Sequence, residues 1–198
     1  GNYTITRAGN STSTITPKAL TLTAAAVSKT YDGGTTYSTQ AGDLTALSNQ
    51  LITGDTVSSA TISFADKNAA TGSKVITLDA VTISDANNGG NYTITRAGNS
   101  TSTITPKALT LTAASVSKTY DGGTTYSTQA ADLTALSSQL ITGDTVSSAT
   151  ISFADKNAAS GSKVVTLDAV AISDTNNGGN YTITRAGNST STITPKAL

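Results

Sequence analysis

Tyrosine and aspartate stand side by side twice in this sequence, as Tyr31-Asp32 and Tyr120-Asp121, and each pair is followed by two glycines. An aromatic ring can stack on a sugar while a neighbouring carboxylate accepts hydrogen bonds, so these four residues are candidate ligand-binding residues. A turn with a packed tyrosine accounts for the same residues, because Asp-Gly-Gly favours a tight turn. One tyrosine and one aspartate make a poor sugar platform, and we favour the turn.

Aspartates could also hold a metal ion, and four of them, Asp55, Asp66, Asp79 and Asp85, lie in or next to expected loops. Calcium takes about six to eight oxygen ligands, usually with several carboxylates close in sequence. The chain has no Asp-x-Asp-x-Asp-Gly loop, and residues 85–89 are the nearest approach. We therefore predict solvated turns, no metal site and no cofactor.

Covalent and catalytic chemistry finds little support. Lys29 or Lys74 could form an isopeptide bond with an asparagine, but such bonds normally need a buried acid, usually Glu, and the sequence has no Glu. The absence of Cys and His excludes disulfides, Cys/His zinc sites and catalysis by these residues within this sequence. No carboxylate pair is marked out for hydrolysis. We predict that the chain is not an enzyme.

The charge balance bears on possible partners. Twelve Lys and Arg residues balance twelve Asp residues, so no basic excess is available for nucleic acid. No apolar run approaches the length of a membrane span. We predict no nucleic-acid partner and no membrane insertion.

An internal repeat organises the whole chain, because residues 1–20 recur identically at 90–109 and at 179–198, an offset of 89 residues. A unit of this length is too long for a solenoid and can hold its own core. We predict three segments: 1–19, the terminal hairpin of a preceding repeat; 20–108, the first repeat; and 109–198, the second repeat. The two full repeats differ at seven positions: Ala26/Ser115, Gly42/Ala131, Asn49/Ser138, Thr71/Ser160, Ile76/Val165, Thr82/Ala171 and Ala86/Thr175.

The pattern within one repeat is mostly that of strands. Alternation predicts strands over 20–27, 57–64 and 74–83, with a bulge near Asp79 where the alternation changes phase. Further strands are expected from Tyr92 and over 101–104, with a turn at 97–100. The only helical pattern is 43–51, with an expected N-cap at Asp43. This order predicts tandem β-grasp-like domains with one short helix each, and an immunoglobulin-like β-sandwich is the alternative.

Five motifs in order carry a resemblance to a known family. They are Lys29-Thr30-Tyr31-Asp32-Gly33, Gly54-Asp55-Thr56-Val57, Phe64-Ala65-Asp66-Lys67-Asn68, Asn91-Tyr92-Thr93 and Ile104-Thr105-Pro106-Lys107-Ala108-Leu109. The chain resembles the YDG repeat domains and related MBG-type domains of large bacterial surface adhesins, many of them similar to filamentous-haemagglutinin-type proteins of two-partner secretion. The resemblance covers both repeats. Gly34 departs from it, since Thr or Asn often follows the motif in that family.

The resemblance implies an extracellular stalk module with no catalytic residues. We expect structural stalk or spacer repeats of a secreted bacterial adhesin or fibre, forming a semi-rigid rod whose partners are neighbouring repeats. The alternative is a multivalent module that binds a host or matrix glycan. The content of 40 Thr and 25 Ser, without Cys or Met, suits a bacterial cell surface.

The first residues carry a separate expectation. Residues 1–18 repeat 90–107, so they correspond to the end of a repeat whose body is missing from this sequence. We therefore expect Tyr3 and Ile5 to be exposed, and Tyr92 and Ile94 to be buried.

Overall fold

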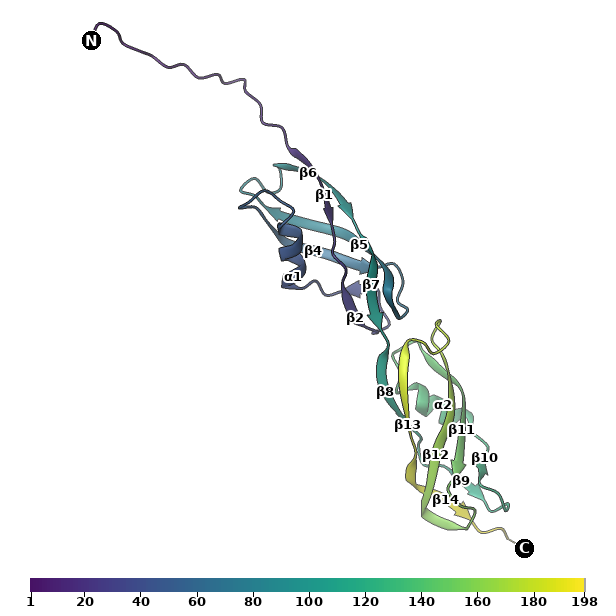
Figure 1. Ribbon diagram of the computed structural model, residues 1–198. Helices are drawn as coiled ribbons and strands as arrows, with labels where there is room; N and C mark the ends of the chain where they lie inside the picture. The colour runs from purple at the N-terminus through teal and green to yellow at the C-terminus, as the bar shows by residue number, and fades with distance from the viewer. Residues whose placement is uncertain (198) are drawn as a thin grey trace. The chain divides into compact units, whose positions relative to one another are not determined.

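The computed structural model describes residues 1–197 (Figure 1). The chain divides into two compact units whose boundary does not follow the repeats. The first unit comprises Gly1–Ala25, Ser38–Ile62 and Thr77–Gly98. The second comprises Ala26–Tyr37, Ser63–Ile76 and the chain from Asn99 onward, so it holds the second repeat together with one end of the first.

The second repeat contains seven strands arranged in two sheets. A five-stranded sheet has the order β10-β11-β12-β14-β9, and β8 pairs with β13 in parallel as a separate two-stranded sheet. The strand β9 also pairs in parallel with β14. The bounds are β8 Lys107–Thr112, β9 Ser117–Thr119, β10 Thr125–Tyr126, β11 Thr145–Phe153, β12 Ala159–Ser173, β13 Tyr181–Ala186 and β14 Asn188–Thr194.

The first repeat has the same elements in the same order. Its five-stranded sheet has the order β2-β7-β5-β4-β3, and β1 pairs in parallel with β6. The bounds are β1 Lys18–Thr23, β2 Ser28–Thr30, β3 Thr36–Tyr37, β4 Thr56–Phe64, β5 Ala70–Ser84, β6 Tyr92–Ala97 and β7 Asn99–Thr105. The prediction of mostly β repeats in tandem, each with one short helix, is confirmed.

The last two strands of a repeat do not form the predicted hairpin. The strands β13 and β14 are separated only by Gly187, yet β13 pairs with β8 whereas β14 pairs with β12 and β9. The chain thus steps from one sheet to the other at a single glycine. A Cβ at Gly187 would collide with the Val165 carbonyl, so the step needs glycine there. The predicted turn at 97–100 is the same kind of step, between β6 and β7.

The helices are α1, Ala41–Ser48, and α2, Ala130–Ser137. The prediction of Asp43 as the N-cap is wrong, because the helix begins at Ala41 and Gln40 is the N-cap. Asp43 instead accepts a hydrogen bond from the Gln40 backbone N–H at 2.8 Å, which satisfies a donor at the helix start. Each helix has only eight residues, and among residues 1–197 none could cross a bilayer.

The predicted bulge is confirmed in the second repeat. Thr150 pairs with Ala169 and Ile151 with Leu167, so Asp168, the counterpart of Asp79, is an extra residue in β12. The bulge resets the alternation and lets both halves of this long strand turn apolar side chains inward.

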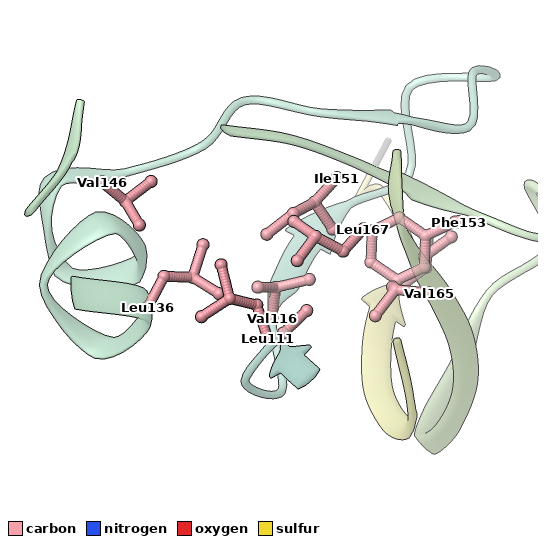
Figure 2. Close-up of a cluster of buried hydrophobic side chains, with 10 residues drawn as sticks. Leu111, Val116, Leu136, Val146, Ile151, Phe153, Val165 and Leu167 are labelled. Atoms are coloured by element: carbon pink, nitrogen blue, oxygen red, sulfur yellow. The ribbon is translucent and has the colours of Figure 1, made fainter. Parts of the chain in front are cut away.

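The core of the second repeat lies between α2 and the sheet. Figure 2 shows Leu136 pointing from α2 toward Leu111 and Val116, while Phe153 packs beside Val165. A helix this short depends on such burial for its stability. The buried cluster consists of Leu111, Ala113, Val116, Leu136, Val146, Ile151, Phe153, Val165, Leu167 and Ile193.

Residues 1–17 form no strand, although they share the sequence of 90–106. Tyr3 and Ile5 are 92% and 83% exposed, whereas Tyr92 is buried and Ile94 is half-buried. The same sequence therefore forms strands at Tyr92–Ala97 and Asn99–Thr105 but none at residues 1–17. That residues 1–19 belong to a preceding repeat stays a prediction.

Replacement of Phe153 by Ala should lower the free energy of unfolding by about 3–5 kcal/mol, because Phe153 is 3% exposed within the cluster. Urea unfolding of the two-repeat chain measures the change. Val164→Ala is the matched control, since Val164 is 47% exposed on the same sheet and should change the free energy by less than about 0.5 kcal/mol. Equal effects of the two substitutions would contradict the assigned strand phase.

Candidate functional site

The Tyr31-Asp32-Gly33 motif forms a turn locked by a lysine. The Lys29 ammonium donates to Asp32 Oδ1 at 2.7 Å and to the Gly34 carbonyl at 2.8 Å, and Asp32 Oδ1 also accepts from the Gly34 N–H. Burial raises the pKa of Asp32, but these hydrogen bonds outweigh burial and hold the pKa below its ordinary value. Gly33 has φ +82°, which disfavours any other residue. The aspartate and glycine of the motif therefore set the turn.

The tyrosine of the motif points away from solvent. Tyr31 is only 1% exposed, and its hydroxyl donates to Asp144 Oδ2 at 2.8 Å. Tyr181 donates to the same oxygen at 2.6 Å, and the two rings meet edge to face with their centroids 5.5 Å apart. The Lys67 ammonium lies 3.8 Å from the other oxygen, Asp144 Oδ1. One buried carboxylate thus gathers two phenols and a cation.

A second group of contacts lies beside this one. The Ala69 N–H donates to Asn180 Oδ1 at 2.7 Å, and Asn180 Nδ2 donates to Asn68 Oδ1 at 3.2 Å. Asn176 Nδ2 donates to the Ala69 carbonyl at 3.3 Å. Asn180 is completely buried, and its side chain forms hydrogen bonds with residues of both repeats, all within the second unit.

An aspartate holds the loop that presents these asparagines. Asp174 Oδ1 accepts from the N–H groups of Asn176 and Gly178 at 2.9 and 2.8 Å, and Asp174 Oδ2 accepts from the Asn180 N–H at 3.1 Å. Such a carboxylate fixes a loop by taking up several backbone donors at once. The loop thus holds Asn176 and Asn180 in position to form hydrogen bonds with Asn68 and Ala69.

Thr175 in this loop has φ +65°, an unfavourable backbone conformation for a β-branched residue. Its hydroxyl, which has one proton to donate, lies 2.6 Å from the Asp174 carbonyl oxygen and 3.1 Å from Asn68 Oδ1. The counterpart Ala86 adopts φ +61°, so the loop imposes this conformation in both repeats. The strain at Thr175 accompanies a contact with the first repeat.

We name the two sides of this contact by their residues. The YDG surface consists of Tyr31, Gly33, Lys67, Asn68 and Ala69, and its counterpart in the second repeat is Tyr120, Gly122, Lys156, Asn157 and Ala158. The receiving surface consists of Ile141, Asp144, Thr175, Asn176, Asn180 and Tyr181, and its counterpart in the first repeat is Ile52, Asp55, Ala86, Asn87, Asn91 and Tyr92.

The fit at Gly33 is close. A Cβ at Gly33 would lie 2.7 Å from Ile141 Cγ2, so a larger residue there would push the surfaces apart. Glycine is therefore required at this position both by its backbone angle and by the neighbouring isoleucine.

The predicted ligand residues have different surroundings in the two repeats. Tyr31 is buried against Asp144, so its ring offers no free face to a sugar. Tyr120 is 37% exposed, and Asp121 bonds to Lys118 at 2.7 Å, as Asp32 does to Lys29. The structure does not bring the four predicted residues together within one site.

The residues considered for metal or covalent chemistry have other partners. Asp85 accepts three backbone N–H groups of its own loop, and Asp55 accepts from the Tyr92 hydroxyl. Among the described residues, no group of three or more Asp side chains could hold a metal ion. Lys74 is buried and pairs with Asp66, and the hydrogen bond from Lys74 holds the pKa of Asp66 below its ordinary value.

Sequence reasoning missed the partners of Tyr31, above all Asp144 and Asn180. A signal was present, since their counterparts Asp55 and Asn91 lie in two of the recurring motifs that carry the family resemblance. Nothing in the sequence alone pairs these motifs with Tyr31 of the neighbouring repeat.

Comparison with known protein families agrees with the Tyr-Asp-Gly motif described above. The YDG domain family matches residues 16–103 and 105–192. The chain belongs to the YDG domain family. The two matches run in tandem, so both repeats are YDG domains. The comparisons with curated proteins and with solved structures find no match.

The two tyrosine hydroxyl groups that contact Asp144 should make the free energy of unfolding fall at alkaline pH. Burial, followed by the hydrogen bond to Asp144, raises the pKa of Tyr31 and of Tyr181 above the ordinary value of about 10. The stability linked to these groups is therefore fully present below about pH 10 and is lost as the pH rises further. Urea unfolding across this range should show a steep fall for the parent and a shallower fall for Tyr31→Phe.

Tyr120→Phe is the matched control, because it also removes one hydroxyl from a YDG motif but leaves the Asp144 contact intact. It should keep the steep fall of the parent. An unchanged slope in Tyr31→Phe would show that this phenol does not donate to a buried carboxylate.

Proposed function

We propose that these YDG domains are structural stalk or spacer repeats of a secreted bacterial adhesin or extracellular fibre. In this proposal the repeats form a semi-rigid array, and the partner of each repeat is its neighbour in the array. The observation that carries the proposal is the buried contact of Tyr31 with Asp144 and Tyr181 inside the second unit. A residue used to bind a soluble ligand would not be buried in this way.

The connection between the repeats supports the same role. Strand β7 ends at Thr105 and β8 begins at Lys107, so only Pro106 separates them. Proline restricts its own φ and the residue before it, and a short link without Gly or Ser acts as a spacer. The Lys107 N–H also donates to the Asn180 carbonyl at 2.9 Å, which ties the start of β8 to the receiving surface.

The chemistry of the contact suits a permanent neighbour. Buried polar groups are costly unless they are paired, and Asp144, Asn180 and Tyr31 are all paired across the contact. If the neighbour moved away, Asp144 would lose a hydrogen bond and Tyr31 would expose its ring. Both costs oppose hinge motion between the repeats.

The alternative function, multivalent binding of a host or matrix glycan, has less support. Of the two predicted platforms, Tyr31 is 1% exposed. Tyr120 is accessible but has no second aromatic residue within its motif. Among residues 1–197, no group of three or more Asp side chains could hold a metal ion for a catalytic role.

For the fold we propose a β-grasp-like arrangement in preference to an immunoglobulin-like sandwich. In the first repeat, the first two strands pair in parallel with the last two, β1 with β6 and β2 with β7, and the helix lies between these pairs of strands in sequence. An immunoglobulin sandwich is built from antiparallel sheets.

Small-angle X-ray scattering tests the spacer role. The dilute parent should scatter as an elongated particle. A narrow range of orientations between the two repeats should fit its scattering curve, because the contact at Asp144 resists bending. Asp144→Ala removes the carboxylate and should broaden that set, whereas Asp55→Ala, its counterpart at the other receiving surface, should not. A compact particle with its repeats side by side, or equal curves for all three proteins, would contradict the proposal.

A further inference from the structure

The beginning and the end of the second repeat run side by side (Figure 1). The strand β8 pairs with β13 in parallel, with Lys107 opposite Tyr181. After the chain changes sheets, β9 pairs with β14, again in parallel. We call these paired segments, residues 107–120 and residues 180–194, the terminal seam.

Hydrogen bonds continue along the seam where the chain changes sheets. The Ala113 N–H donates to the Ala186 carbonyl at 2.9 Å, and Asn188 Nδ2 donates to the Ala113 carbonyl at 3.1 Å. Further on, the Thr192 N–H donates to the Val116 carbonyl at 2.9 Å. The two pairs of strands are therefore linked into one series of bonds.

One face of the seam packs into the core of the repeat. Leu111 of β8 and Ile193 of β14 are completely buried. Ser191 is 1% exposed, and its hydroxyl oxygen accepts from the Val116 N–H at 3.1 Å. Water competes poorly for hydrogen bonds beside a buried core, so these bonds are stronger than bonds at an open surface.

A glutamine holds the edge of β8 that faces away from β13. The Gln139 side chain accepts from the Thr112 N–H at 3.0 Å and donates to the Thr112 carbonyl at 2.9 Å. Gln50 makes the same two bonds with Thr23 in the first repeat. A strand that is bonded along both edges resists sliding more than a strand bonded along one.

Parallel pairing decides how tension along the chain acts on the seam. The chain enters the second repeat at Lys107, beside the start of β13, and leaves it after Thr194, which lies opposite Thr119 at the end of β9. Tension between these two points pulls the two sides of the seam past each other along the strand direction. The bonds of a parallel ladder are evenly spaced, so they share this load and have to break together. A load across the strands would instead open the bonds one after another from one end.

We propose that the terminal seam is a shear clamp that allows each YDG domain to bear tension along the chain without unfolding. This function goes beyond the spacer role, because the spacer role depends on the contact between repeats whereas the clamp lies within one repeat. Only the presence of a load in the natural setting rests on the proposed stalk function. The first repeat has the same parallel pairings, β1 with β6 and β2 with β7, so both domains carry the clamp.

Single-molecule force spectroscopy of the full chain in two pulling directions provides the test. Handles at the two ends of the chain load both repeats in shear. In the second direction the C-terminal handle is moved to Thr182→Cys, an exposed site opposite Ala108, and the sequence has no other Cys. Tension then enters and leaves the second repeat at the same end of its seam and peels the strands apart.

At equal pulling speed, the second repeat should unfold in the peeling direction at a force lower by about twofold or more, since forced unfolding reports the barrier along the pulled direction. The first repeat is the internal control, because it is loaded from end to end in both directions and should keep its unfolding force. Equal forces for the second repeat in the two directions would overturn the proposal.

A pair of variants tests the seam bonds themselves. Ser191→Ala removes the acceptor of the Val116 N–H, whereas Thr128→Val removes a bond outside the seam, from the Thr128 hydroxyl to the Ala149 carbonyl at 3.0 Å. Under end-to-end tension, Ser191→Ala should raise the unfolding rate of the second repeat about fivefold or more above that of Thr128→Val. Urea unfolding of both variants measures the loss of stability without force, for which the rates are corrected.

Equal corrected rates for the two variants would contradict a load-bearing seam. The comparison of pulling directions keeps every seam bond of the parent, so it decides the proposal even if Ser191→Ala does not fold. Neither experiment changes Asp144 or its partners. X-ray scattering therefore still reports on the spacer role, and the two proposals can fail separately.

Discussion

The carboxylate of Asp144 is the point on which the contact between the repeats depends. It is 4% exposed, and a charge so far from water is tolerated only when hydrogen bonds and opposite charge compensate for it. Tyr181 provides one hydrogen bond from the same repeat, whereas Tyr31 and Lys67 come from the preceding repeat. The neighbouring repeat therefore supplies much of the compensation, which couples the stability of this site to the presence of the neighbour.

The repeated sequence provides its own control for this interpretation. Asp55 and Tyr92 keep the same hydrogen bond without a neighbour, and Asp55 is then half-buried instead of buried. The local fold of a repeat thus builds the receiving surface, and the neighbour only covers it. A module of this kind can be added many times to an array without changing its sequence, which fits the near identity of the two YDG domains.

Much of the fold follows from local pattern, and the rest depends on contacts distant in sequence. The phase change near Asp79 predicts the bulge, because alternation reports directly which face is buried. At 97–100, the counterpart of the step at Gly187, the pattern predicts a turn, since a glycine between two short strands gives no sign that each strand joins a different sheet. The predicted turn with a packed ring at Tyr31 is confirmed, but the partner Asp144 lies 113 residues away and no spacing rule connects the two residues.

A double-mutant cycle between Tyr31→Phe and Asp144→Asn tests the central claim most directly, with the free energy of unfolding as the measured quantity. If the phenol of one repeat compensates the buried carboxylate of the next, the two substitutions should be coupled by about 1 kcal/mol or more. The matched cycle between Tyr120→Phe and Asp55→Asn, measured at low concentration, should show no coupling, because those residues do not meet within one molecule. Additive effects within about 0.3 kcal/mol in the Tyr31 and Asp144 cycle would contradict the account.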